Sequence, residues 1–414
     1  MPESARTNLL IILILGALST VSPFSIDMYL PAFPQIAHDL GTTQAQISLS
    51  VSGYFIGLAL GQLFYGPLLD RFGRKPPLYA GLSLFTVASL GCIAVRSAEL
   101  FIAFRLLQAL GGCVAQVGAI AMVRDFFPAR ESAKILSLLM LVLSVSPLFA
   151  PSIGSVITTS IGWPWIFVAL AGFAVLLMIV IRLLLPEGHW PDPQISLLPR
   201  AILEGFHQIL IRPQFYTYAL AGAFAFAGLF VYVAGSPIVF IDGFQVGPRT
   251  YGLIFAVLAC GFIGGSQLNI WLSRRHEDHK IFRVAVVCQN VIMLIIVLGT
   301  FFGWYSLAGT VVLLLAYLPF CGIAYPNAAA IALAPFSKNV GSASAVLGFL
   351  QMGIGALAST GVGLLHATSS LAVFMVMAAT ALVGLVILLA NHSRVRLAQA
   401  GEVSPPGHIR RAEA

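Results

Sequence analysis

Residues 66–78 read GPLLDRFGRKPPL, a short segment in which one acid and three bases lie close together. Long apolar stretches flank it, near 45–69 and 76–95, and each reaches the roughly 20 residues that a helix needs to cross a bilayer. The segment therefore reads as a charged loop between two membrane spans. The whole chain agrees, because 59% of its 414 residues are hydrophobic and only 9% are charged, far from the averages of soluble proteins.

The remaining sequence contains ten more stretches of this kind. We expect an all-α integral membrane protein with twelve transmembrane helices arranged in two six-helix halves. The first stretch is too long for a signal peptide and lacks a small-residue cleavage site, so we expect it to be retained. The predicted spans are 8–34, 45–69, 76–95, 99–123, 133–158, 163–185, 214–240, 250–273, 281–302, 305–332, 340–366 and 370–391.

The distribution of Lys and Arg predicts the orientation, since positively charged loops stay in the cytoplasm. With the amino terminus inside, nearly all of the 22 basic residues fall in cytoplasmic loops or tails; Arg96 and Arg249 lie outside, and Arg105 lies within a span. Both termini are then cytoplasmic. The net charge of +7 is explained by orientation and by contact with the lipid bilayer, because the scattered bases form no nucleic-acid-binding face.

A polar, proline-rich connection separates the halves. The predicted domains are 1–187, an amino-terminal six-helix half; 188–213, a cytoplasmic linker; 214–392, a carboxy-terminal half; and 393–414, a basic cytoplasmic tail. The linker forms either a short amphipathic helix on the membrane surface or a flexible tether. The helical alternative is suggested by apolar residues at helical spacing, Ile202, Leu203, Phe206, Ile209 and Leu210.

The two halves repeat one motif. Gly57 and Gly61 in the second span correspond to Gly261 and Gly265 in the eighth, and a basic loop follows each pair. Glycines spaced by four residues allow two helix backbones to approach closely. Duplicated halves of this kind indicate a secondary transporter whose binding site lies between the halves, near the middle of the membrane.

Four motifs extend this reading: the 66–78 loop, RLLQALGG at 105–112, SVSPLFAPSIGS at 144–155 and DMYLPAFP at 27–34. Together they resemble the major facilitator superfamily, and the last is similar to the pattern of its Bcr/CflA drug-resistance branch. The resemblance implies a transporter of the bacterial inner membrane that exports antibiotics in exchange for protons. It also implies function as a monomer, with a small-molecule drug and protons as its partners.

Asp27 is the only acid that lies away from the ends of a predicted span, since all the others fall in loops, tails or span ends. An ionised carboxylate in the bilayer core costs at least about 2.5–3.5 kcal/mol, so such residues generally serve a function. Two interpretations remain: Asp27 carries the coupled proton, or it fastens a broken helix through neighbouring hydroxyls. Arg105, the only base that lies away from the ends of a span, is at the same predicted depth, which permits a direct or water-bridged pair, and Gln108 shares its helix face.

Polar and aromatic side chains within the spans are candidates for a drug pocket with apolar walls and a few polar anchors. With no second acid inside a span, neutral or zwitterionic compounds are the expected substrates. The candidates for proton coupling are Asp27 and Arg105, and those for substrate binding are Asp27, Tyr29, Tyr54, Arg105, Gln108, Tyr232, Asn327 and Gln351.

The resemblance also implies a gate at the 66–78 loop. Asp70 is expected against the start of the eleventh span, where free backbone N–H groups favour an anion, and Arg74 is expected to pair with Asp125. These contacts would hold the cytoplasmic ends together while the outside is open. The gating candidates are Asp70, Arg71, Gly73, Arg74, Asp125, Pro147, Pro151, Gly154, Gly341 and Ser342.

Other classes of protein find little support. The sequence has no P-loop, GxSxG or HExxH motif, and His276 and His279 lie in a short solvated loop that is poorly suited to a metal. We therefore expect no enzyme, no metal and no cofactor. The alternatives to drug export are a proton-coupled importer of a small polar solute and a non-transporting membrane sensor or scaffold.

Overall fold

The computed structural model describes residues 3–186, 188, 191–192, 206–336, 340–364 and 369–391. Within them the chain forms twelve helical segments long and apolar enough to cross a membrane, as the sequence predicted. The first span is longer than expected, Asn8–Asp39 in place of 8–34, because a further short helix runs from Phe33 to Asp39.

In its described residues, the amino-terminal half contains seven α-helices and one 3₁₀ turn. They are α1 (Glu3–Asp27), η1 (Leu30–Ala32), α2 (Phe33–Asp39), α3 (Gln44–Arg71), α4 (Lys75–Ala94), α5 (Ala98–Phe126), α6 (Ala129–Ser160) and α7 (Pro164–Leu184). The carboxy-terminal half contains α9 (Pro213–Pro237), the π-helical η2 (Ile238–Gly243), α10 (Pro248–Leu272), α11 (Asp278–Phe301), α12 (Leu307–Leu333), α13 (Val340–Leu364) and α14 (Ser370–Ala390).

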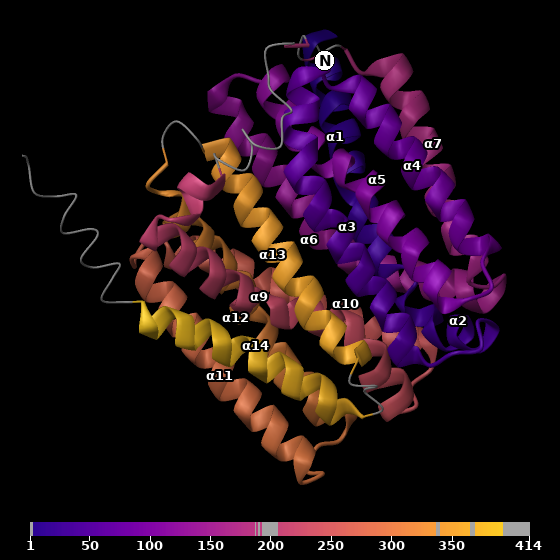
Figure 1. Ribbon diagram of the computed structural model, residues 1–414, viewed down its shortest axis with the longest axis vertical. Helices are drawn as coiled ribbons and strands as arrows, with labels where there is room; N and C mark the ends of the chain where they lie inside the picture. The colour runs from indigo at the N-terminus through magenta and orange to yellow at the C-terminus, as the bar shows by residue number, and fades with distance from the viewer. Residues whose placement is uncertain are drawn as a thin grey trace, which may run out of the picture.

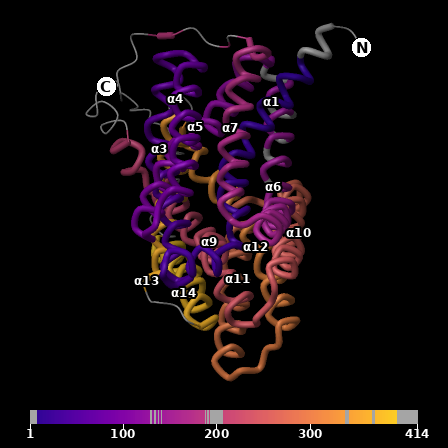
Figure 2. The backbone as a smooth tube through the Cα atoms, turned by 90° about the vertical axis from the view of Figure 1, so that its right-hand side faces the viewer, coloured from indigo at the N-terminus to yellow at the C-terminus, as the bar shows by residue number. Residues whose placement is uncertain are grey.

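The helices pack mainly within their own half, and Figure 1 shows the two groups as separate bundles, indigo to magenta and red to yellow. Two helix pairs carry most of the contact between them: α3 lies against α13, and α6 lies beside α10 (Figure 2). Any site between the halves is therefore bordered by α3, α6, α10 and α13.

We call the end of the bundle with the α3–α4 and α10–α11 loops the basic end, and the other end the opposite end. Three helices that start at the opposite end have side-chain caps: Thr43, Ser97 and Ser306 each accept a hydrogen bond from a backbone N–H of the first turn. Such caps satisfy donors that the helix itself leaves free. They define where α3, α5 and α12 begin.

The predicted repeat of close-packed glycines is present in both halves. A Cβ added to Gly57 would meet the Cβ of Ala109 in α5 at 2.7 Å, and one added to Gly61 would meet the Cys113 Cβ at 2.6 Å. In the second half, a Cβ at Gly261 would meet Leu315 of α12 at 2.8 Å, and one at Gly265 would collide with the Pro319 backbone. The same motif thus joins α3 to α5 and α10 to α12.

The halves meet toward the opposite end. The hydroxyl groups of Ser52 in α3 and Ser359 in α13 share a hydrogen bond of 2.8 Å, and the Gln44 side chain donates to the carboxylate of Asp242. Near the middle of the spans, the rings of Phe55 and Phe230 lie 4.4 Å apart between α3 and α9. At the basic end, Gly341 and Ser342 of α13 are exposed.

The linker is described only in part. Residues 206–210 are helical, Ile209 is buried in the core of the carboxy-terminal half, and Phe206 packs against the same core. This part of the predicted amphipathic segment therefore contacts protein, while Leu210 is 40% exposed. Ile202, Leu203 and the 393–414 tail lie outside the described residues.

The close approach of α3 and α5 predicts that Gly57→Ala destabilises the protein. Its new methyl group would overlap the Leu106 carbonyl and the Ala109 side chain, and overpacking of this kind costs about 1–3 kcal/mol. Thermal unfolding in detergent, followed by tryptophan fluorescence, should show a lower Tm. Gly172→Ala in α7 is the matched control, because nothing lies within 4 Å of its Cβ. Equal Tm values for the two variants would contradict the packing.

Candidate functional site

The first span is interrupted at its acid. Residue Asp27 is the last of α1, and Pro31 and Pro34 follow it. Because proline has no N–H, Pro31 cannot bond to the Asp27 carbonyl, nor Pro34 to the Leu30 carbonyl, as a continuing α-helix would require. The helix gives way to η1 and then restarts as α2. This places the Asp27 side chain, which is 4% exposed, at a break in a membrane helix.

Arg105 lies fully buried on α5 and binds the chain just before this break. One guanidinium nitrogen donates to the Ser25 hydroxyl at 2.9 Å and the other to the Ser25 carbonyl at 2.9 Å. The first nitrogen also donates to Oε1 of Gln108, whose Nε2 in turn donates to the Ser89 hydroxyl at 2.7 Å. Arg105 therefore connects α5 to α1 through a polar network in the membrane core.

Aromatic rings enclose the guanidinium group of Arg105. Its central carbon lies 4.2 Å from the ring centre of Tyr29, 4.3 Å from that of Tyr54 and 5.8 Å from that of Phe167. Cation–π contacts of this kind contribute about 2 kcal/mol or more when they are desolvated. They partly offset the cost of burying a cation that has no carboxylate within ion-pair distance among the described residues.

Asp27 and Arg105 do not form the direct pair that the sequence left open: no hydrogen bond or ion pair joins them in the described part of the chain. Their predicted common depth is consistent with the Arg105 contact to Ser25, two residues before the acid. Residues two positions apart in an α-helix project about 200° apart around the helix axis, so Ser25 and Asp27 point to opposite sides of α1. The η1 turn that directly follows Asp27 contacts α9 and α10 of the other half, the helices that carry Tyr232 and Tyr251.

The proline- and glycine-containing part of α6 lies between the break and the other half. A Cβ on Gly154 would collide with the Met28 carbonyl, directly after the acid. On the other side, a Cβ on Gly252 of α10 would lie 3.4 Å from the Pro151 carbonyl. These close approaches allow α6 to touch both the Asp27 break and the carboxy-terminal half, and Pro147 lies in the same helix.

The remaining candidates for the drug pocket do not lie together in one place. Tyr29 is fully buried in its own half, with its hydroxyl 2.7 Å from that of Ser50, and Tyr54 is covered by Arg105. Tyr232 stacks on Phe255 at 5.5 Å, and its buried hydroxyl has no hydrogen-bond partner in the described part of the chain.

Asn327 and Gln351 lie farther along the carboxy-terminal half. Asn327 donates to Asn269 at 2.6 Å between α12 and α10, and Gln351 on α13 is 7% exposed. Sequence reasoning did not identify Tyr251 or the contact between Phe55 and Phe230, because no local pattern indicates which aromatic residues face the partner half.

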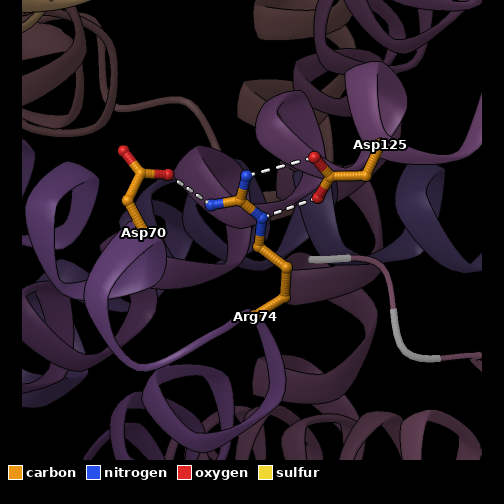
Figure 3. A network of polar contacts seen from close by, with 3 residues as sticks. All are labelled: Asp70, Arg74 and Asp125. Carbon is orange, nitrogen blue, oxygen red and sulfur yellow. Dashed lines mark hydrogen bonds and ion pairs between the residues drawn. The ribbon is translucent and has the colours of Figure 1, made fainter. Parts of the chain in front are cut away.

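A charge cluster at the basic end joins α3, α4 and α5 (Figure 3). Arg74 donates to both oxygens of Asp125, at 2.6 and 3.1 Å, and to Asp70 at 2.7 Å. Burial acts to lower the pKa of Arg74, but the hydrogen bonds and charges of Asp125 and Asp70 outweigh it and raise that pKa. The side chains of Arg74 and Asp125 are 8% and 10% exposed, against 49% for Asp70.

The contact expected between Asp70 and the start of α13 is not found among the described residues. Gly341 has nothing within 4 Å of its Cβ position, and both Gly341 and Ser342 are exposed. Asp70 instead binds Arg74 within its own half. Gly73 has φ +81°, a left-handed conformation that favours glycine, and Arg71 lies over the Phe72 ring at 5.8 Å.

The Arg105 network predicts that Arg105→Lys lowers stability although it keeps the charge. An ammonium group cannot reproduce the two-pronged contact with Ser25, and hydrogen bonds from charged groups contribute about 1.5–3 kcal/mol each. Ser25→Ala is the graded comparison, because it removes the hydroxyl and leaves the carbonyl. Thermal unfolding should rank wild type above Ser25→Ala and Ser25→Ala above Arg105→Lys. An unchanged Tm in Arg105→Lys would show that the network is dispensable.

Several known proteins resemble this chain. An uncharacterized MFS-type transporter, YdgK of Bacillus subtilis, is 30% identical over 92% of this chain and 95% of its own length. The bicyclomycin resistance protein homolog of Haemophilus influenzae is 29% identical over 85% of this chain and 88% of its own. The multidrug resistance protein MdtL of Escherichia coli O9:H4 is 30% identical over 81% and 84%.

Solved structures share the fold. A D-xylose–proton symporter matches with a TM-score of 0.71 and 14% identity, covering 92% of this chain and 97% of its own. A bacterial homolog of the human lysosomal transporter Spinster matches with a TM-score of 0.68 and 16% identity, covering 98% and 100%. Residues 15–360 match the Major Facilitator Superfamily, and the chain belongs to this family of membrane transporters.

Proposed function

We propose that this protein exports small amphipathic compounds, with antibiotics as the expected class, in exchange for protons. The names of its relatives, a bicyclomycin resistance homolog and multidrug resistance proteins, support drugs as the cargo. The observation that carries the proton-coupling part is the position of Asp27. It is a buried carboxylate at a helix break, and the η1 turn that follows it contacts α9 and α10 of the half that must move against its own.

The orientation follows from charge. Lys and Arg gather at the basic end, so this end and both termini lie in the cytoplasm of a bacterial inner-membrane protein. The hydrogen bond between Ser52 and Ser359 and the one from Gln44 to Asp242 then lie toward the outer side. This arrangement corresponds to a state that is closed toward the outside, and rocking of the halves would open the other side in turn.

Coupling rests on the changing surroundings of Asp27. An ionised carboxylate is expensive where it meets neither water nor a cation, so closing the halves around it favours binding a proton. Opening to water allows Asp27 to exchange its proton with the solution on that side. When the pocket faces the cytoplasm, the drug binds and displaces the proton from Asp27; when the pocket faces outside, a proton returns and the drug leaves. The drug shifts this equilibrium only by binding the two states unequally.

Arg105 has a different role in this scheme. Its hydrogen bonds to Ser25 and Gln108 and its ring contacts hold it within the amino-terminal half. It acts as a fixed cation that positions α1, and so the break, without pairing with Asp27. The pocket for the drug is bordered by aromatic residues of both halves, including Phe55, Phe230 and Tyr232, which suits apolar compounds with few charges.

Asp27→Asn should abolish uphill export, because asparagine keeps the shape of aspartate but cannot carry a proton. The measurement is uptake of a labelled drug into inverted membrane vesicles under an imposed pH gradient, at matched protein amounts. Glu99→Gln, which removes an exposed acid near the opposite end, is the control and should accumulate drug as the wild type does.

Two outcomes would contradict the proposal in different ways. If Asp27→Asn still concentrates drug in proportion to the pH gradient, Asp27 is not the proton carrier. If wild-type vesicles accumulate no compound from a broad panel of antibiotics, drug export itself is wrong. If right-side-out vesicles instead accumulate a polar solute, the protein would be a proton-coupled importer.

The charge cluster predicts separable effects for its two acids. Asp125→Asn should lower Tm, because removing one partner of a buried ion pair costs about 3–5 kcal/mol. Asp70→Asn should leave Tm near wild type, since its carboxylate is 49% exposed, but should slow drug transport severalfold if Asp70 meets α13 when the cytoplasmic side closes. The two readouts are thermal unfolding and vesicle uptake. Asp70→Asn with unchanged transport would exclude this gating role.

A further inference from the structure

A groove of about 290 Å³ lies at the basic end of the carboxy-terminal half, between α10, α11 and α12. Its walls are apolar side chains of all three helices, including Leu272, Ile281 and Phe320. His276 and Lys280 line it from the α10–α11 connection and the start of α11. The groove therefore combines an apolar interior with two polar, basic groups.

The groove lies at the depth of lipid headgroups. Trp271 precedes the groove residue Leu272 and is 48% exposed, and the Arg275 guanidinium lies 4.5 Å from its ring centre. Tryptophan and arginine near the end of a span mark the boundary between hydrocarbon and headgroups. Val284, on the groove wall one turn after Lys280, is 60% exposed, which indicates that the groove is open on its outer side.

The α10–α11 connection beside the groove carries a net positive charge that a ligand can reach. Residues 274–280 read RRHEDHK, with more Lys and Arg than Asp and Glu. Lys280 forms an ion pair with Glu277 at 2.8 Å, but their side chains are 66% and 64% exposed. Exposed pairs of this kind contribute little, so a phosphate group can compete for Lys280. The groove between α4 and α7 has only one basic residue, Arg182, and is a weaker match.

We propose that the α10–α11–α12 groove binds an anionic phospholipid, with one acyl chain against its apolar walls and the phosphate held by Lys280 and His276. Basic pockets between transmembrane helices on the cytoplasmic side recognise anionic headgroups in this way. Lys280 contributes charge and His276 an N–H donor. This site is separate from Asp27 and Arg105, and it does not depend on what the protein transports.

The experiment measures lipid binding by native mass spectrometry of delipidated protein in detergent, with phosphatidylglycerol and phosphatidylcholine as probes. Wild type should prefer phosphatidylglycerol. Lys280→Gln should weaken that binding by roughly fivefold, the effect of about 1 kcal/mol per basic residue near a membrane surface. Val284→Trp keeps both basic groups but obstructs the groove, and should weaken binding of phosphatidylglycerol as well.

Arg249→Gln is the matched control, because it removes one exposed base at the opposite end and should bind lipid as the wild type does. Inorganic phosphate, added in excess, should displace little lipid if the acyl chain contributes. The proposal is overturned if the two lipids bind equally, if Lys280→Gln matches Arg249→Gln, if Val284→Trp binds like wild type, or if phosphate alone displaces the lipid.

Discussion

Pro31 has no N–H to offer the Asp27 carbonyl, and the first membrane helix ends at that residue. In a bilayer an interrupted helix is tolerated only where protein or water surrounds it. Here the break is covered by α6, which approaches so closely that only glycine fits at position 154, and by α9 and α10 of the other half, which contact η1. The interruption thus brings a carboxylate, a glycine-containing helix and the partner half to one place.

The buried guanidinium group of Arg105, beside this break, is stabilised within one half of the protein. Arg105 has no acidic partner among the described residues, and its burial is offset by Ser25, Gln108 and two tyrosine rings. All of these belong to the amino-terminal half. Arg105 can therefore keep its contacts while the halves move, whereas the η1 turn that follows Asp27 contacts the half that moves relative to it. This division gives one charged group a constant environment and the other a variable one.

Much of the fold could be predicted from sequence, because hydropathy alone requires apolar spans and the paired glycines require close helix contacts. The depth of Arg105 was also accessible from residue counting. The residue of α1 that Arg105 contacts could not be predicted, because two residues at the same depth need not face each other. Ser25 contacts Arg105, while Asp27 points away from it. Tyr251 and Phe230 could not be identified, since their role depends on how two separate bundles meet. The contact expected between Asp70 and α13 depends on conformation, and this structure has the halves joined at the other end.

The central claim is that Asp27 exchanges its proton for the drug. The most direct measurement is proton release from purified protein in weakly buffered detergent when a transported drug is added. Wild type should release protons in a saturable manner that follows drug occupancy, and Asp27→Asn should bind drug without releasing any. Equal proton release from the two proteins would contradict the account, because the proton would then come from another group.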